Sequence, residues 1–220
     1  MKIKAVLTAT LGGAFEWYDF IIYGFFLQIF GHQFFPQASS EAEQITAFII
    51  FAVGFFARPI GGLVFGYIGD IYGRSRSLYY SMMLIGVATF CLAIMPTYNQ
   101  IGRVSTLIFI TLRIFQGFAI GGSISGSFIY ISELSEPHNR SFWVSTVSIG
   151  LIRGVVFAAV VSGLLISYLT YEQLHTWGWR IAFLSGATII ILARYSTPLM
   201  VETPYHSELV KNQQIEKSPV

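Results

Sequence analysis

The sequence predicts an all-α integral membrane protein, on two grounds. Of its 220 residues, 54% are hydrophobic and only 11% are charged, whereas a soluble domain carries about 25% charged residues. Long apolar stretches also recur along the chain, and a membrane-spanning helix needs about 20 mostly apolar residues. A chain of this composition can cover a lipid-facing surface, but it has too little charge to cover a solvated one.

Six apolar stretches are long enough to span a bilayer, and polar loops separate them. They predict a six-helix transmembrane bundle over residues 1–200 and a cytoplasmic tail at 201–220. The first stretch is too long for the core of a cleavable signal peptide, so we expect it to remain as the first helix. The approximate helix ranges are 5–30, 45–68, 77–96, 105–131, 142–169 and 181–200.

Basic residues near the helix ends set the expected orientation, because cytoplasmic loops carry an excess of lysine and arginine. If the N-terminus is inside, Arg103 and Arg180 are the two basic residues on the outer side. An even number of helices then places both termini in the cytoplasm. The seven residues of the inner side are Lys2, Lys4, Arg74, Arg76, Arg140, Lys211 and Lys217.

Charged residues also fall inside the apolar stretches, namely Glu16, Asp19, Arg58, Arg113 and Arg153. A charge at mid-bilayer costs at least about 2.5–3.5 kcal/mol, so such residues usually pair or face a cavity. At 1.5 Å per residue, Glu16 and Asp19 lie ~18 and ~22 Å above the inner end of the first helix. Arg113 lies ~12 Å below the outer end of the fourth, which is the same depth in a core about 30 Å thick. We therefore expect a carboxylate of the first helix to meet Arg113.

A carboxylate beside a guanidinium in a cavity can act as a proton switch, because protonation of the acid releases the arginine. Glu16 and Asp19 are three residues apart and share one helix face. The alternative is a permanent ion pair that fixes the helix register. Three arginines in the spans against two acids leave a positive surplus, which favours an anionic or zwitterionic solute.

A glycine-rich loop links the second and third predicted helices, where glycine permits a tight turn. Asp70 and Arg74 of this loop can form a charge network with residues of the next inner loop, and we expect the network to act as a cytoplasmic gate. The expected gate residues are Gly66, Asp70, Gly73, Arg74, Arg76, Glu133 and Arg140. Small residues four apart let helices approach closely, and the expected packing glycines are Gly62, Gly117, Gly121 and Gly122.

The loop Gly66-Tyr-Ile-Gly-Asp70-Ile-Tyr-Gly73-Arg74-Ser-Arg76 resembles the signature of the major facilitator superfamily. Further motifs resemble its metabolite:proton symporter family, which includes proline/betaine and dicarboxylate carriers. They are Glu16-Trp-Tyr-Asp19-Phe, Arg58-Pro-Ile-Gly-Gly62, Arg113-Ile-Phe-Gln116-Gly117, Trp177-Gly-Trp-Arg-Ile-Ala-Phe183 and Glu202-Thr-Pro204.

This resemblance implies the N-terminal six-helix half of a major facilitator fold, in a bacterial inner membrane. It also implies proton-coupled transport by alternating access of a small zwitterionic or anionic metabolite, such as a proline/betaine-like osmolyte or a carboxylate. The expected proton-coupling and cavity residues are Asp19, Glu16, Arg113, Arg58 and Gln116. The expected partners are the lipid bilayer, the solute and protons.

The sequence departs from the family pattern at several positions. Ser123 stands where the family commonly has an acid, and Arg153 stands where it favours small or apolar residues. Thr197-Pro198 replaces a usual basic pair. Family members also have about twelve helices in two halves, with the site between them.

These departures leave three readings open. The chain is a truncated or split half-transporter that works with a separately encoded C-terminal six-helix half or with a second copy, or it is an inactive remnant of a decayed gene. An intramembrane hydrolase using Ser123 is a remote third reading, because all four histidines lie in loops or the tail and Gly122-Ser-Ile-Ser-Gly126 is not a G-x-S-x-G elbow. We expect no enzyme activity, metal or cofactor, since no ligand spacing or nucleotide motif is present, and no nucleic-acid partner, because the net charge is only +2.

Overall fold

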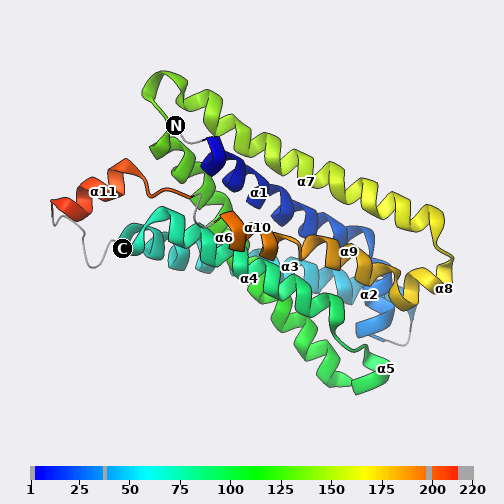
Figure 1. Ribbon diagram of the computed structural model, residues 1–220. Coiled ribbons are helices and arrows are strands. Elements are labelled where there is room, and N and C mark those ends of the chain that lie inside the picture. Colours follow the sequence, from blue (N-terminus) through cyan, green and yellow to red (C-terminus); the bar gives the residue numbers. More distant parts are fainter. Residues whose placement is uncertain (1–2, 37–38, 197–199, 213–220) are drawn as a thin grey trace.

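The computed structural model describes residues 3–36, 39–196 and 200–212. Long helices run side by side in an elongated bundle, and this part of the chain contains no strand (Figure 1). The long helices are α1 (Ile3–Phe25), α3 (Ser40–Tyr72), α4 (Arg74–Ile94), α6 (Arg103–Leu134) and α7 (Arg140–Tyr168). The predicted all-α class is confirmed.

The last crossing of the bundle is assembled from shorter pieces. A helical turn α8 (Tyr171–Gln173) and a π-helical turn η2 (Leu174–Gly178) lead into α9 (Trp179–Gly186) and α10 (Ile189–Ser196). The helical segment therefore begins at Tyr171, ten residues before the start of the predicted range 181–200. Residues 197–199 of that range lie outside the described part of the chain. The other short elements are α2 (Leu27–Phe34), α5 (Tyr98–Ile101), η1 (Pro137–Asn139) and α11 (Pro204–Lys211).

Several helices differ in length from the apolar stretches that predict them. The first stretch, 5–30, is divided at Phe26 into α1 and α2. The helix predicted at 45–68 begins earlier, because the hydroxyl oxygen of Ser39 accepts a hydrogen bond from the Ala42 N–H at 3.3 Å and caps the helix N-terminus. Polar residues in the first and last turns thus extend such helices beyond the apolar stretches that predict them.

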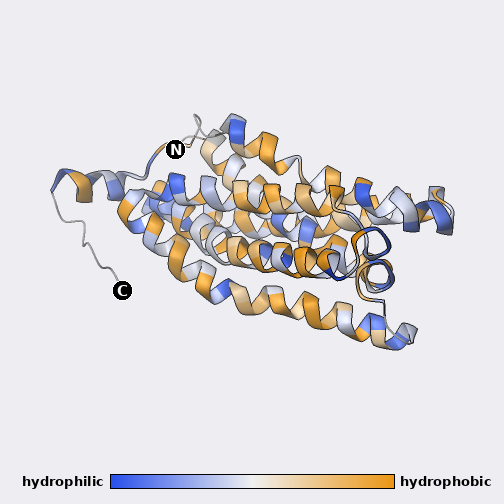
Figure 2. Ribbon diagram, turned by 90° about the horizontal axis from the view of Figure 1, so that it is seen from below, coloured by the Kyte–Doolittle hydropathy of each residue, from blue (hydrophilic) through white to orange (hydrophobic). Residues whose placement is uncertain are grey.

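The surface of the bundle suits a bilayer. Figure 2 shows apolar residues along the sides of the long helices and polar residues gathered near the bundle ends. Among the described residues, five helical segments are long and apolar enough to cross a membrane, namely α3, α4, α6, the segment Pro137–Tyr168 and the segment Tyr171–Tyr195. The helix α1 is not among these five; it runs beside them (Figure 1) and carries two acidic residues.

Glycines let α3 and α6, the most extensively packed pair of helices, touch through their backbones. A Cβ atom on Gly117 would overlap the backbone of Gly54, and one on Gly121 would overlap the backbone of Arg58. On α3 the closest approach is at Gly61, where a Cβ would overlap the Phe118 carbonyl.

The other predicted packing glycines differ in how closely they are approached. A Cβ atom on Gly122 would overlap the side chain of Phe65, so this glycine also lies at a tight contact. Gly62 has only an ordinary contact, at 3.5 Å from the Gly121 oxygen, and Gly66 has no neighbour within 4 Å of its Cβ position. Gly62 and Gly66, which are four residues apart on α3, therefore do not form the tight contact with α6. Gly61 forms it.

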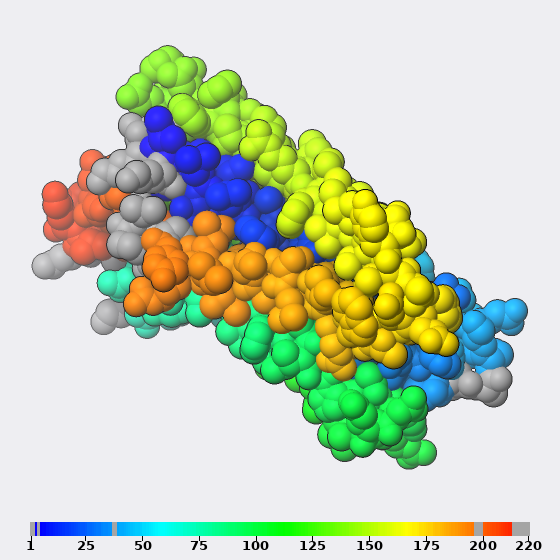
Figure 3. All heavy atoms as spheres, turned by 45° about the vertical axis from the view of Figure 1, so that its right-hand side comes forward, coloured from blue at the N-terminus to red at the C-terminus, as the bar shows by residue number. Residues whose placement is uncertain are grey.

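The two ends of the bundle differ. The start of α1, the α3–α4 turn, the α6–α7 turn and α11 lie together at one end (Figure 1). At the other end, aromatic side chains of α1, α2, α6 and α9 form a buried cluster. On the face shown in Figure 3, α9 and α10 fill the space between α1 and α4.

Candidate functional site

A buried ion pair joins α1 to α6 in the interior of the bundle. Asp19 is 2% exposed and Arg113 is 5% exposed, and the distance from Asp19 Oδ2 to Arg113 Nη1 is 3.7 Å. The Thr89 hydroxyl of α4 donates to Asp19 Oδ1 at 2.8 Å, and Gln116 Nε2 donates to that hydroxyl oxygen at 2.9 Å. The structure thus brings together the two helices that the depth estimate pairs. Thr89 joins them, and nothing in the sequence singles it out.

The pair has hydrogen-bonding capacity left over. Arg113 Nε and Nη2 and Gln116 Oε1 have no hydrogen-bond partner among the described residues. The guanidinium lies 3.8 Å from the centre of the Tyr23 ring, in cation–π geometry.

A narrow pocket adjoins the pair. Its polar lining consists of Asp19, Arg58, Arg113 and Gln116, and its apolar lining comes from Phe20, Phe51, Gly54, Gly117 and Ile120. It has about 20 Å³ of room for solvent, which is close to the space that one water molecule needs. In this conformation the pocket is too small for a solute.

A second acid, Glu16, lies one helical turn from Asp19 and is fully buried. The Ser123 hydroxyl of α6 donates to Glu16 Oε1, whereas Oε2 has no partner in the described structure. Arg58 stacks on aromatic rings, at 4.1 Å from the Phe55 centre and 4.8 Å from the Phe20 centre. The Ser123 hydroxyl therefore forms its hydrogen bond with a carboxylate.

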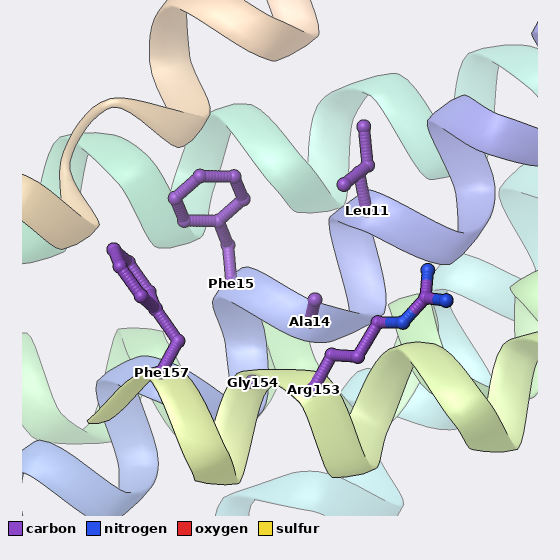
Figure 4. A pocket seen from close by; sticks show the side chains of 6 residues that line it. All are labelled: Leu11, Ala14, Phe15, Arg153, Gly154 and Phe157. Atoms are coloured by element: carbon purple, nitrogen blue, oxygen red, sulfur yellow. The ribbon is translucent and has the colours of Figure 1, made fainter. Parts of the chain in front are cut away.

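Arg153 does not join this cluster. It is exposed on α7 and lines a separate pocket with residues of α1 (Figure 4). The expected surplus of three arginines over two acids is therefore not found at this site. Without Arg153, the two arginines Arg58 and Arg113 are matched by two acids, since Glu16 interacts electrostatically with Arg58 and Asp19 pairs with Arg113.

A second charge network lies at the end of the bundle that holds the α3–α4 turn. Arg74 Nη2 is 2.7 Å from Asp70 Oδ1, and Arg74 Nε is 3.2 Å from Glu133 Oε1. The turn itself depends on Gly73, whose φ of 109° is one that other residues rarely adopt. Three helices, α3, α4 and α6, are thus tied together by one arginine.

Glu202 completes this network, and Arg140 does not. Arg140 is exposed and forms no ion pair with the described residues, and Arg76 is also exposed. Instead, Glu202 accepts hydrogen bonds from the Arg74 backbone N–H at 2.9 Å and from the Ser75 hydroxyl at 2.7 Å. The triplet Glu202-Thr-Pro204 is visible in the sequence, but only the fold shows that its carboxylate caps α4.

Replacing Glu202 with alanine is expected to lower the free energy of unfolding by about 1–2 kcal/mol, because α4 loses the acceptor for its first N–H group and for the Ser75 hydroxyl. Thermal unfolding in mild detergent measures the loss. Glu208→Ala, on the exposed face of α11, is the matched control and should change stability by less than about 0.5 kcal/mol. Equal effects of the two substitutions would rule out the capping role.

Comparison with known proteins agrees with this geometry. The model of the family described as "Sugar (and other) transporter" matches residues 5–218. The proline/betaine transporter of Salmonella typhimurium is 37% identical over 201 residues, which are 91% of this chain and 40% of that protein. The glycine betaine/proline/ectoine/pipecolic acid transporter of Dickeya dadantii is 35% identical over 201 residues, which are again 91% of this chain and 40% of that protein.

Solved structures match as well. The partially occluded inward-open xylose transporter XylE from E. coli superposes with a TM-score of 0.86 at 25% identity, over 96% of this chain and 53% of that one. The inward-open form of the same transporter superposes with a TM-score of 0.84 at 25% identity, over 97% of this chain and 50% of that one. The chain belongs to the sugar (and other) transporter family, and its resemblance to the major facilitator superfamily and to proline/betaine carriers is confirmed. It spans about 40% of the length of the curated relatives it matches.

Proposed function

We propose that this chain forms one side of a pathway that carries a small zwitterionic or anionic metabolite across the membrane together with protons. The observation that carries the proposal is the buried pair of Asp19 and Arg113. At 3.7 Å it is a loose pair, and it borders a pocket between three helices. Buried charges in a membrane protein usually mark a solute or proton pathway.

The chemistry of the switch follows from the contacts. A proton on Asp19 removes the negative charge that holds the Arg113 guanidinium, and Arg113 is then available for a carboxylate of the solute. Thr89 and Gln116 keep the acid in place by hydrogen bonding while its charge changes. Deprotonation restores the ion pair and displaces the solute.

The charge of the pocket supports the solute class. Arg58 and Arg113 line it with Asp19, and Glu16 interacts electrostatically with Arg58, so the four charges balance when all are ionised. Protonation of Asp19 leaves one excess positive charge, which a carboxylate-bearing solute balances. The Salmonella typhimurium relative is named a proline/betaine transporter, and both proline and betaine carry a carboxylate.

We further propose that a second six-helix bundle completes the pathway, encoded in the same polypeptide or separately, or supplied by a second copy. Transporters of this type bind solute between two repeats. Beside the pocket, α3 presents an unpartnered apolar face, formed by Ile45, Phe48, Ile49, Phe56 and Ile60. The network around Arg74 is the cytoplasmic gate in this proposal, with both termini in the cytoplasm of a bacterial inner membrane.

The test is solute uptake by membrane vesicles from cells that express the chain. With an alkaline interior, the vesicles should accumulate labelled proline, betaine or a dicarboxylate, and a protonophore should abolish the accumulation. Uptake that is unchanged in the presence of the protonophore would contradict proton coupling. Vesicles from cells without the chain supply the background.

A further inference from the structure

Arg153 is the charged residue of the membrane spans that the proposed function does not use. It lines a pocket with about 170 Å³ of room for solvent in the groove between α1 and α7. Figure 4 shows its side chain lying along this groove, beside apolar side chains of both helices. The other lining residues carry no polar side chain and are Leu11, Ala14, Phe15, Gly154 and Phe157.

The depth of Arg153 makes its charge costly. It lies near the middle of the 29-residue helix α7, so its Cα is about 20 Å from either end of the helix. An extended arginine side chain spans about 6 Å, whereas half of the hydrocarbon core is about 15 Å thick. The guanidinium therefore stays within the hydrocarbon, and it forms no ion pair or hydrogen bond with the residues that the structure describes.

The groove lies apart from the proposed transport pathway. Leu11 and Glu16 are about 140° apart around α1, at 100° per residue. Phe15 packs against Ile189 and Ala193 of α10, and Figure 3 shows α1 exposed between α7 and α10. The surrounding surface is apolar and exposed, with Leu7, Ile149, Ile152, Val156 and Val160 on α1 and α7.

A second copy of this chain does not supply the missing negative charge. Of its acidic residues, Glu16 and Asp19 alone lie at depth within the described spans, and both are buried. A phospholipid phosphate does not match the depth either, because headgroups lie some 20 Å from the bilayer centre. A carboxylate on a transmembrane helix matches the charge, the depth and the elongated shape of the groove.

We propose that the groove between α1 and α7 docks a transmembrane helix from outside these 220 residues, and that an aspartate or glutamate near the middle of that helix pairs with Arg153. Gly154 packs directly against the Ala14 backbone, so α1 and α7 lie close together at the base of the groove. Pairing neutralises two charges that are each costly in hydrocarbon. This docking does not depend on the solute or on proton coupling.

The experiment uses two designed leucine/alanine peptides that span a bilayer and differ in one central residue, glutamate or glutamine. The full chain carries a donor dye on its single cysteine, Cys91, and the peptides carry an acceptor. Both are reconstituted in phosphatidylcholine vesicles, and energy transfer is followed against peptide density. The glutamate peptide should associate at least about tenfold more tightly than the glutamine peptide, since a charge-assisted bond contributes about 1.5–3 kcal/mol.

Arg153→Leu should abolish the preference for glutamate, and Arg103→Leu, at the outer end of α6, should preserve it. Arg153→Glu should reverse it toward a peptide with a central lysine. Equal association of the two peptides with the unaltered chain would overturn the proposal, and this comparison does not depend on the folding of any variant. A preference that persists in Arg153→Leu would overturn it too. Energy transfer to a labelled fatty acid that depends on Arg153, with equal peptide association, would assign the site to a lipid instead.

Discussion

Replacing Arg113 with methionine is expected to lower the free energy of unfolding by about 3–5 kcal/mol, because it leaves the buried Asp19 carboxylate without its counter-charge. Both partners are almost fully enclosed, so solvent cannot take over the role of the arginine. Reversible unfolding in mixed micelles of mild and denaturing detergent measures the change. This is the largest loss that we expect from a single side chain.

The control is the double substitution Asp19→Asn with Arg113→Met, which removes both charges. It should recover most of the lost stability, because a buried pair replaced by neutral groups of similar volume is often close to neutral. A single substitution that costs less than about 1 kcal/mol would show that Asp19 does not depend on Arg113. Losses that simply add in the double variant would show the same.

Gly61→Ala is expected to cost about 2–3 kcal/mol, because α3 and α6 would have to separate. The added Cβ would overlap the carbonyl group of Phe118. That group is backbone and cannot move aside as a flexible side chain does. Unfolding in the same detergent mixture, together with thermal unfolding, measures the loss.

Gly66→Ala is the matched control on the same helix, since no atom lies within 4 Å of the Cβ position of Gly66. This variant should keep the stability of the unaltered chain or gain up to about 1 kcal/mol from helix propensity. Similar losses at both positions would mean that the α3–α6 crossing is not set by the close contact at Gly61.

The fold class follows from the sequence because apolar stretches of spanning length are direct evidence of membrane helices. The meeting of a carboxylate of the first helix with Arg113 follows as well, since depth along a helix is proportional to residue number. Only the structure shows that this carboxylate is Asp19 and not Glu16. The rotation of each helix about its axis does not follow from depth. The sequence pattern therefore groups Arg153 with Arg58 and Arg113 as charges within the spans, whereas in the structure Arg153 lies against a different side of α1.

Contacts between distant segments also escaped prediction. Thr89 is one hydroxyl in an apolar stretch, and such a group often bonds to its own helix. Glu202 lies far along the chain from the α4 N-terminus that it caps. Gly61 and Gly62 are neighbours in sequence, and only the crossing geometry shows which of them meets α6. Each of these depends on how helices pack, which no local pattern specifies.

The account rests on Asp19 as the residue that couples protons to transport, and Asp19→Asn tests it most directly. Two assays are compared in vesicles where the unaltered chain accumulates solute: uptake driven by a proton gradient, and exchange of labelled for unlabelled solute without a gradient. We expect Asp19→Asn to lose gradient-driven accumulation and to retain exchange, because asparagine preserves the hydrogen bond from Thr89 but cannot carry the proton. Accumulation equal to that of the unaltered chain would contradict the account.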